Sequence, residues 1–236
     1  MFESLKNALG LGKASNARQG KTAVANGKGV ANPVSEWANT QGLAFSERRD
    51  GRGGYQIEGK VGGKAWRIEQ GQPSRDFIKG TELRARAELD VRDDVAVMVI
   101  NRQLKNDLDK RAFAMYTDTL QTVVDASLPE EMRWLAMYEE MGWESLGDAF
   151  LNRYAILADK QDHAMAWVTT ELVGSLMTWP HFDPMAPQIL MVLRGKAYLR
   201  MQINHQNDMP TLEHATTLFG TACELALANF STDLAL

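Results

Sequence analysis

Residues 54–70 alternate apolar and polar side chains on either side of a Gly62-Gly63 pair. Period-two alternation that flanks two glycines is typical of a β-hairpin with a two-residue turn. The turn sets four cross-strand pairs: Val61 with Lys64, Gly59 with Trp66, Glu58 with Arg67, and Ile57 with Ile68. We therefore expect the indole to cover the bare backbone of Gly59 on an apolar face, and an ion pair to form on the other face.

Further strands are predicted on both sides of this hairpin. Residues 43–45 read as a first strand, residues 82–89 alternate between charged and apolar side chains, and residues 95–100 are apolar on both faces. A strand without a polar face is buried on both sides, so residues 95–100 are expected to be the most buried strand. The pattern predicts a mostly antiparallel sheet of about five strands over residues 42–101.

One face of this sheet is expected to be charged. Strand phase brings three arginines together, at Arg67, Arg84 and Arg86. Nucleic-acid-binding sheets place aromatic residues among such basic ones, but Tyr55 and Trp66 fall in the apolar phase, which disfavours nucleic acid. We expect solvated ion pairs with four glutamates, at Glu58, Glu69, Glu82 and Glu88.

The remaining chain alternates helices and strands. A short helix is predicted around Val34, a helix of about six turns from Leu104, and another that starts at Pro129 and extends to Met141. After these come a strand (154–157), a helix (162–179), a hairpin (189–203) and a final helix (212–229). The fold class is α+β, with mostly antiparallel sheet(s) built from hairpins and packed against three to four helices.

This layout resembles uncharacterised bacterial domains of unknown function. The segments that carry the resemblance are residues 55–59, 66–69, 153–156, 170–172 and 189–203. They span most of residues 42–230, and the resemblance implies an α+β fold without implying an activity. We expect residues 32–236 to form a single domain, with two half-units at 32–145 and 146–236 as the alternative division.

Composition narrows the class of protein. Among 236 residues, 44% are hydrophobic and 24% are charged, which is typical of globular chains and excludes disorder or collagen. The single cysteine, Cys223, excludes an internal disulfide framework and a cysteine-rich zinc site. Without a membrane-spanning run or a signal-peptide core, the chain is predicted to be cytoplasmic.

Charge divides the chain into a basic and an acidic part. Residues 1–86 carry 15 Lys and Arg against 8 Asp and Glu, whereas residues 87–236 carry 11 against 22. Residues 1–31 predict a short amphipathic helix followed by a basic flexible linker. Such a segment can lie on an anionic membrane surface, here its inner face, or bind an acidic partner; docking on the protein's own fold is the alternative. The residues expected to make the contact are Phe2, Leu5, Lys6, Leu9, Lys13, Arg18 and Lys21.

Candidate chemistry is sparse. Residues 15–22 approach a phosphate-binding loop, but neither a buried strand before them nor a long helix after them supports that function. No histidine has metal-ligand spacing, and no motif indicates a catalytic residue or a cofactor. The most distinctive cluster is Trp-Pro-His-Phe-Asp at 179–183, where Trp179, His181 and Asp183 combine aromatic walls with titratable groups.

Two hypotheses follow from different functional classes. The sequence favours a non-enzymatic adaptor or scaffold that meets an anionic membrane surface or an acidic protein partner through residues 1–31. The alternative is a small-molecule-binding protein or an enzyme with a site near residues 179–183. The partner's identity and the oligomeric state are left open.

Overall fold

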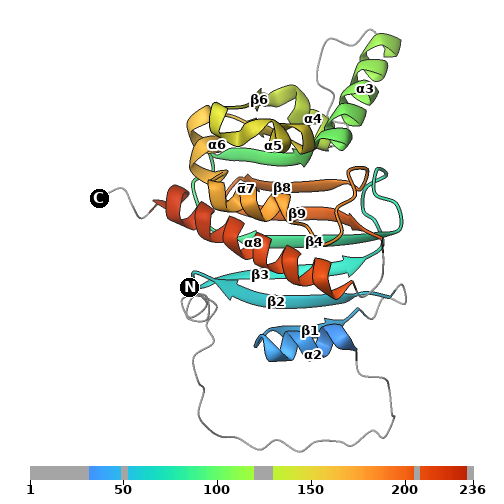
Figure 1. Ribbon diagram of the computed structural model, residues 1–236, viewed down its shortest axis with the longest axis vertical. Coiled ribbons are helices and arrows are strands. Elements are labelled where there is room, and N and C mark those ends of the chain that lie inside the picture. Colours follow the sequence, from blue (N-terminus) through green and yellow to red (C-terminus); the bar gives the residue numbers. More distant parts are fainter. Residues whose placement is uncertain (1–31, 49–52, 120–129, 205–207, 233–236) are drawn as a thin grey trace, which may run out of the picture.

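A computed structural model describes residues 32–48, 53–119, 130–204 and 208–232 (Figure 1). In this part of the chain nine strands form a single antiparallel sheet, in the order β1-β2-β3-β4-β9-β8-β5-β7-β6. The strands are β1 (Ala44–Glu47), β2 (Tyr55–Val61), β3 (Lys64–Gly71), β4 (Thr81–Glu88), β5 (Ala96–Asn101), β6 (Glu139–Met141), β7 (Tyr154–Ala158), β8 (Gln188–Leu193) and β9 (Lys196–Ile203).

Seven α-helices accompany the sheet in the described residues. They are α2 (Pro33–Thr40), α3 (Arg102–Thr119), α4 (Glu130–Met137), α5 (Gly147–Arg153), α6 (Gln161–Trp167), α7 (Thr170–Met177) and α8 (Met209–Phe230), with a 3₁₀ turn at Glu144–Leu146. The predicted α+β class is confirmed, although three to four helices were expected. None of the described helices combines the length and the apolar character needed to span a membrane.

The central hairpin has the register that the sequence predicts. Val61 pairs with Lys64, Gly59 with Trp66, Glu58 with Arg67, and Ile57 with Ile68. Gly62 and Gly63 have φ angles of 54° and 78°, the positive values that a two-residue hairpin turn requires. The ion pair expected between Glu58 and Arg67 is replaced by another. Nε of Arg67 lies 3.1 Å from Oε1 of Glu69, a residue of the same strand.

The larger core lies on one face of the sheet, beneath the helices α2, α5, α6, α7 and α8. The longest of these, α8, begins with Asp208 as its N-cap, whose carboxylate accepts from N and Oγ1 of Thr211. Farther along it, Cys223 is fully buried, and burial raises the pKa of its thiol. The indole of Trp167 donates to the Ala222 carbonyl at 2.8 Å, which joins α6 to α8.

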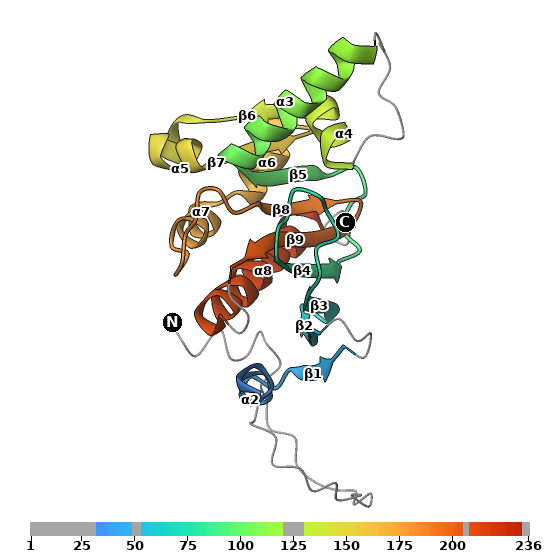
Figure 2. The same ribbon diagram turned by 90° about the vertical axis from the view of Figure 1, so that its right-hand side faces the viewer.

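The opposite face is covered only in part. A second core packs α3, α4 and the loop residues Phe77 and Ile78 against β5, β7 and β8. In the edge-on view, α7 and α8 lie on one side of the sheet, while α3 and α4 lie at the end that holds β5 (Figure 2). Among the described residues, neither core covers the outer side chains of β2, β3 and β4, and on β9 only Tyr198 packs against the second core. We call this region the open face.

The sheet differs from the predicted one in how its strands are ordered. Five strands do lie between residues 42 and 101, and β5 is buried along its whole length, as predicted. However, β4 does not pair with β5, because the β8–β9 hairpin is inserted between them. Strands from residues 44–101 and from residues 139–203 thus share one sheet, and the division into half-units stays a prediction.

Three local predictions are wrong. The helix expected over residues 162–179 is broken into α6 and α7, because Val168 leaves helical geometry and Oγ1 of Thr169 accepts from Leu172 N to cap a new helix. Met141, assigned to a helix, lies in the edge strand β6. Glu82, expected to be solvated, is 0% exposed because Arg200 and Ser74 enclose its carboxylate.

Candidate functional site: an arginine-lined face of the sheet

The open face brings like charges into register. Arg67 on β3 lies directly opposite Arg86 on β4, and Arg84 on β4 lies opposite Arg200 on β9. These pairs follow from strand alternation, which sends every second side chain to the same face. Like charges in directly opposed positions repel each other, so each pair lowers the stability of the sheet unless an anion compensates it.

One carboxylate on this face is shared by three guanidinium groups. Glu69 lies 3.1 Å from Arg67, 3.1 Å from Arg84 and 3.5 Å from Arg48. Its side chain is 19% exposed, whereas that of Arg67 is 51% exposed. Arg84 also lies 3.9 Å from a second carboxylate, that of Glu82, so ion pairs link the arginines of this part of the face into one cluster.

A buried carboxylate supports the other side of the cluster. Glu82 accepts a hydrogen bond from Ser74 N at 2.6 Å and lies 3.0 Å from Nη1 of Arg200. Arg200 also donates to Oγ of Ser74 at 2.7 Å. Burial lowers the pKa of Arg200, and Glu82 acts in the opposite direction. The guanidinium of Arg200 is therefore held in a fixed position by partners on two other segments.

At the end of β4, Glu88 forms ion pairs with two basic side chains. It is paired with Arg86 and lies 3.1 Å from Lys196. Partial burial opposes ionisation, but hydrogen bonds from Lys196 and Arg86 outweigh it and lower the pKa of the Glu88 carboxyl. The guanidinium of Arg86 also lies over the ring of Tyr198, 5.8 Å from its centroid.

These side chains surround a hollow of about 270 Å³. Its charged lining consists of five arginines and one glutamate: Arg48, Arg67, Arg84, Arg86, Arg200 and Glu69. Neither histidine nor cysteine is part of this lining. Guanidinium groups present several N–H donors in a planar fork that matches carboxylate and phosphate oxygens. The hollow can therefore bind an anionic group.

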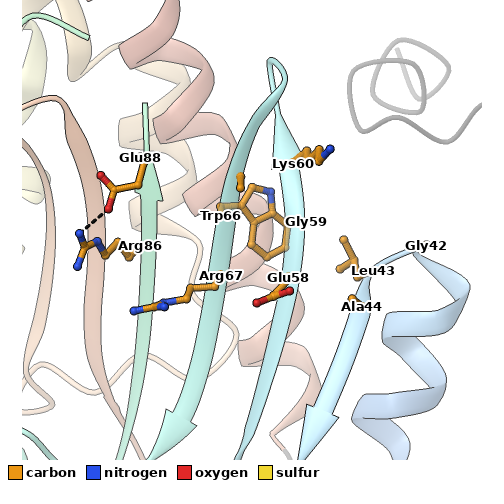
Figure 3. A pocket seen from close by; sticks show the side chains of 11 residues that line it. Gly42, Leu43, Ala44, Glu58, Gly59, Lys60, Trp66, Arg67, Arg86 and Glu88 are labelled. Carbon is orange, nitrogen blue, oxygen red and sulfur yellow. Dashed lines mark hydrogen bonds and ion pairs between the residues drawn. The ribbon is translucent and has the colours of Figure 1, made fainter. Parts of the chain in front are cut away.

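A second hollow of about 730 Å³ adjoins the first and shares Arg67 and Arg86 with it (Figure 3). Figure 3 shows Arg67, Arg86 and Glu88 at its β3–β4 side, and Leu43 and Ala44 at its β1 side. The lining of this second hollow is thus charged on its β3–β4 side and includes apolar residues on its β1 side.

The residues predicted around 179–183 do lie together. Trp179, His181 and Asp183 line a separate pocket of about 360 Å³ between the α7–β8 loop, the end of β9 and the start of α8. Oδ1 of Asp183 accepts from Met185 N at 2.9 Å, and Nε2 of His181 lies 3.9 Å from Oδ1 of Asp208. The role of these residues in ligand binding stays a proposal.

Other chemistry is limited in the described residues. No group of three or more His, Cys, Asp or Glu side chains there is arranged to hold a metal ion. Nδ1 of His163 is 2.9 Å from Asp159, and Nε2 of His214 is 2.9 Å from the Ser175 carbonyl. The predicted contact residues Phe2, Leu5, Lys6, Leu9, Lys13, Arg18 and Lys21, and the loop at 15–22, lie outside the described residues.

Sequence reasoning found three of the five arginines and missed Arg48 and Arg200. A signal for Arg200 was present in the alternation of Lys196, Tyr198 and Arg200 along the later hairpin, a pattern that favours a polar face. What it could not indicate is that this hairpin pairs with β4, which places Arg200 opposite Arg84.

Comparisons with known proteins add little to this geometry. Neither a protein-family model nor a curated protein matches the chain. Among solved structures, the chain is similar to the mycobacterial trehalose monomycolate transport factor A, TtfA, at 11% sequence identity and a TM-score of 0.46, over 81% of this chain and 90% of that one. The proposals below rest on the geometry of this chain alone.

Proposed function

We propose that this chain is a non-enzymatic interaction protein that binds an acidic segment of a partner protein on the open face of its sheet. The observation that carries the proposal is the solvent-accessible hollow in which five arginines face one glutamate. Positive charges held close together repel one another, and an anionic partner removes that repulsion as it binds. The charge pattern supports an acidic partner on this face.

The arginines are also held in place before a partner arrives. Arg200 is fixed by Glu82 and Ser74, and Arg84 by Glu69 at 3.1 Å. Side chains that are already ordered lose less conformational entropy on binding, which favours affinity.

The proposal is tested with a fluorescein-labelled poly-L-glutamate peptide, whose binding to the full chain is followed by fluorescence anisotropy. Arg67→Gln combined with Arg86→Gln should weaken binding about tenfold, since two exposed charge contacts of up to about 1 kcal/mol each are lost. The matched control, Lys110→Gln with Arg111→Gln, removes the same number of charges from exposed positions on α3.

The contribution of the arginines to peptide binding must also be distinguished from that of the basic N-terminal residues. Lys13→Gln with Lys21→Gln measures their share of the affinity for the same peptide. An Arg67/Arg86 double variant that binds as tightly as the wild type, or no more weakly than the α3 control, would contradict the proposal.

We further propose that residues 1–31 attach the protein to an anionic membrane surface. Five basic residues and an apolar stripe of Phe2, Leu5 and Leu9 support this attachment. Sedimentation with anionic liposomes should be lost when these three residues become serine, and binding to neutral liposomes should be weak throughout. Equal sedimentation of the variant and the wild type would exclude a lipid contact by this stripe.

A second candidate function is favoured by the pocket around residues 179–183. Two carboxylates, Asp183 and Asp208, line this pocket together with Trp179, a combination that suits a small organic cation. Tryptamine is a suitable probe: a rise in Tm that Asp183→Asn abolishes and Asp148→Asn preserves would support this function. An unchanged Tm at millimolar tryptamine would contradict this second function.

A further inference from the structure

Four of the helices over the larger core are acidic. α2, α6, α7 and α8 contain neither Lys nor Arg, and all of their carboxylates are exposed. Within the described ranges none of these carboxylates has an ion-pair partner; they are Glu36, Asp162, Glu171, Glu213 and Glu224. The helical side of the molecule is therefore acidic, whereas the open face on the other side of the sheet is lined by arginines.

Two of these carboxylates lie close enough to influence each other. Partial burial raises the pKa of the Glu224 carboxyl, and the charge of Glu171 raises it further. Both effects oppose ionisation, and a cation beside the two residues would counteract them. The outer surface of α7 and α8 thus offers a place for a basic side chain.

A groove between α2 and α8 adjoins Glu224. Both helices lie on the same side of the sheet (Figure 2), and the groove has a volume of about 90 Å³. Its apolar lining comes from Trp37, Leu43 and Trp66, and its α8 lining consists of short residues: Thr216, Thr217, Gly220 and Thr221. A Cβ atom built on Gly220 would meet nothing within 4 Å. Since an apolar cavity of about 150 Å³ holds a benzene molecule, this smaller groove suits one aliphatic side chain.

The chain that precedes α2 is long enough to reach this groove. The far end of α2 lines the groove, about 12 Å along the helix axis from Pro33. Residues 10–31, predicted to be a flexible linker, join α2 to the apolar N-terminal stripe of Phe2, Leu5 and Leu9. A flexible chain of that length spans about 26 Å on average. Such a tether gives an effective concentration of about a millimolar, so a weak contact is enough to hold the stripe.

The charge of the preceding segment is opposite to that of the helices. Residues 1–31 contain five Lys and Arg against one Glu. The acidic helices attract a basic segment, and the arginines of the open face repel it. Lys6 directly follows Leu5, so a stripe seated in the groove brings a cation close to Glu224.

We propose that the N-terminal stripe docks in the groove between α2 and α8 of its own chain, with a leucine of the stripe against Trp37 and Trp66. The same stripe is proposed to enter the membrane, so docking and attachment exclude each other. The folded part then competes with lipid for residues 2–9, and this contact within the chain regulates attachment. The competition rests on the proposed membrane attachment, whereas the docking does not.

Docking is measured in the full chain, without lipid, from a nitroxide on Gly12→Cys. Cys223 is 0% exposed, so the label reacts at position 12. In the ¹H–¹⁵N spectrum the nitroxide should broaden the Trp37 indole resonance. The resonance of Trp143 should stay sharp, because that residue follows β6, at the edge of the sheet opposite β1. Leu5→Ser with Leu9→Ser should remove the broadening, and Trp37→Phe and Trp143→Phe assign the two resonances.

A second variant fills the groove from α8. Gly220→Met should abolish the broadening and strengthen binding to anionic liposomes about tenfold, the effect of releasing one buried aliphatic side chain. Gly174→Met, on α7, is the matched control, since a Cβ atom there also meets nothing within 4 Å. The control should change neither the broadening nor the liposome binding.

The carboxylates are tested in the same way. Glu171→Gln with Glu224→Gln should reduce the broadening of Trp37, because the docked segment loses its counter-charges. Glu144→Gln with Asp148→Asn removes the same number of charges from exposed positions near β6 and should leave the broadening unchanged.

Each outcome bears on one part of the proposal. A Trp37 resonance that stays sharp in the labelled wild type would overturn the docking. Broadening that survives both Gly220→Met and the serine variant would overturn the groove as its place. Broadening between labelled chains and separate ¹⁵N-labelled chains would assign the stripe to the groove of a second copy.

The liposome arm separates docking from attachment. A broadened Trp37 resonance in a wild type that does not sediment with anionic liposomes would overturn the proposed attachment and preserve the docking. Liposome binding that Gly220→Met leaves unchanged, although the variant abolishes the broadening, would overturn the competition.

Discussion

The indole of Trp66 lies against the backbone of Gly59, directly across the β2–β3 hairpin. A Cβ atom built on Gly59 would stand 2.3 Å from Cζ2 of the ring and 2.9 Å from Cδ2 of Leu43. Position 59 must therefore lack a side chain for the ring to pack where it does.

Gly59→Ala is expected to lower the free energy of unfolding by about 1–3 kcal/mol, because the added methyl displaces a buried ring. Urea denaturation measures the loss. Gly142→Ala is the matched control, since a Cβ there meets nothing within 4 Å. Equal stability of the Gly59 variant and the wild type would mean that the ring has room to move.

Glu82→Gln should destabilise the fold by about 3 kcal/mol. The carboxylate is fully buried, and its loss leaves the Arg200 guanidinium without its counter-charge. Glu88→Gln, at a half-exposed position, should cost less than about 1 kcal/mol. Thermal unfolding of the two variants compares them, and similar Tm values would contradict a structural role for the buried pair.

Thr169→Ala should cost about 1 kcal/mol through loss of the N-cap of α7, where Oγ1 accepts from Leu172 N. Thr170→Ala removes the same hydroxyl one residue later, at an exposed position, and should be nearly neutral. Chemical denaturation of both variants decides between a cap at Thr169 and a break in the helix that is imposed by packing alone.

His214 is expected to make stability depend on pH. Burial lowers the pKa of its imidazole, while its hydrogen bond to the Ser175 carbonyl acts in the opposite direction. The folded state thus favours the neutral ring, whereas the unfolded chain takes up a proton near pH 6.5. The unfolded state then binds more protons, so this contribution is present above about pH 6.5 and is lost as pH falls toward the lower folded pKa.

The measurement is Tm against pH for the wild type and His214→Gln. The difference between them should shrink as pH falls below about 6.5. Parallel curves for the wild type and the His214 variant would contradict the prediction.

Local sequence patterns predicted the structural features that depend on residues close together in the chain. The hairpin register follows from alternation and from Gly62-Gly63, and those signals lie within one short stretch. The break at Thr169 was missed because the residues around it keep a helical apolar period on both sides, and only a side-chain cap marks the new start.

Local sequence patterns could not predict which strands pair when those strands are far apart in the chain. Nothing near Glu82 indicates that Arg200 will neutralise it, since that contact requires β9 to lie beside β4. The same pairing completes the arginine cluster, and so the candidate site emerged only from the fold. The pocket at residues 179–183 was found because its main residues are close in sequence.

The insertion of β8–β9 between β4 and β5 constrains the order in which the chain can fold. β4 and β5 are separated by a short loop, yet the strands inserted between them, β9 beside β4 and β8 beside β5, are made about a hundred residues later in synthesis. A ribosome-bound chain that ends before residue 188 therefore has β4 with one unpaired edge, and unpaired edges promote aggregation. We expect slow folding, because the sheet is dominated by non-local contacts.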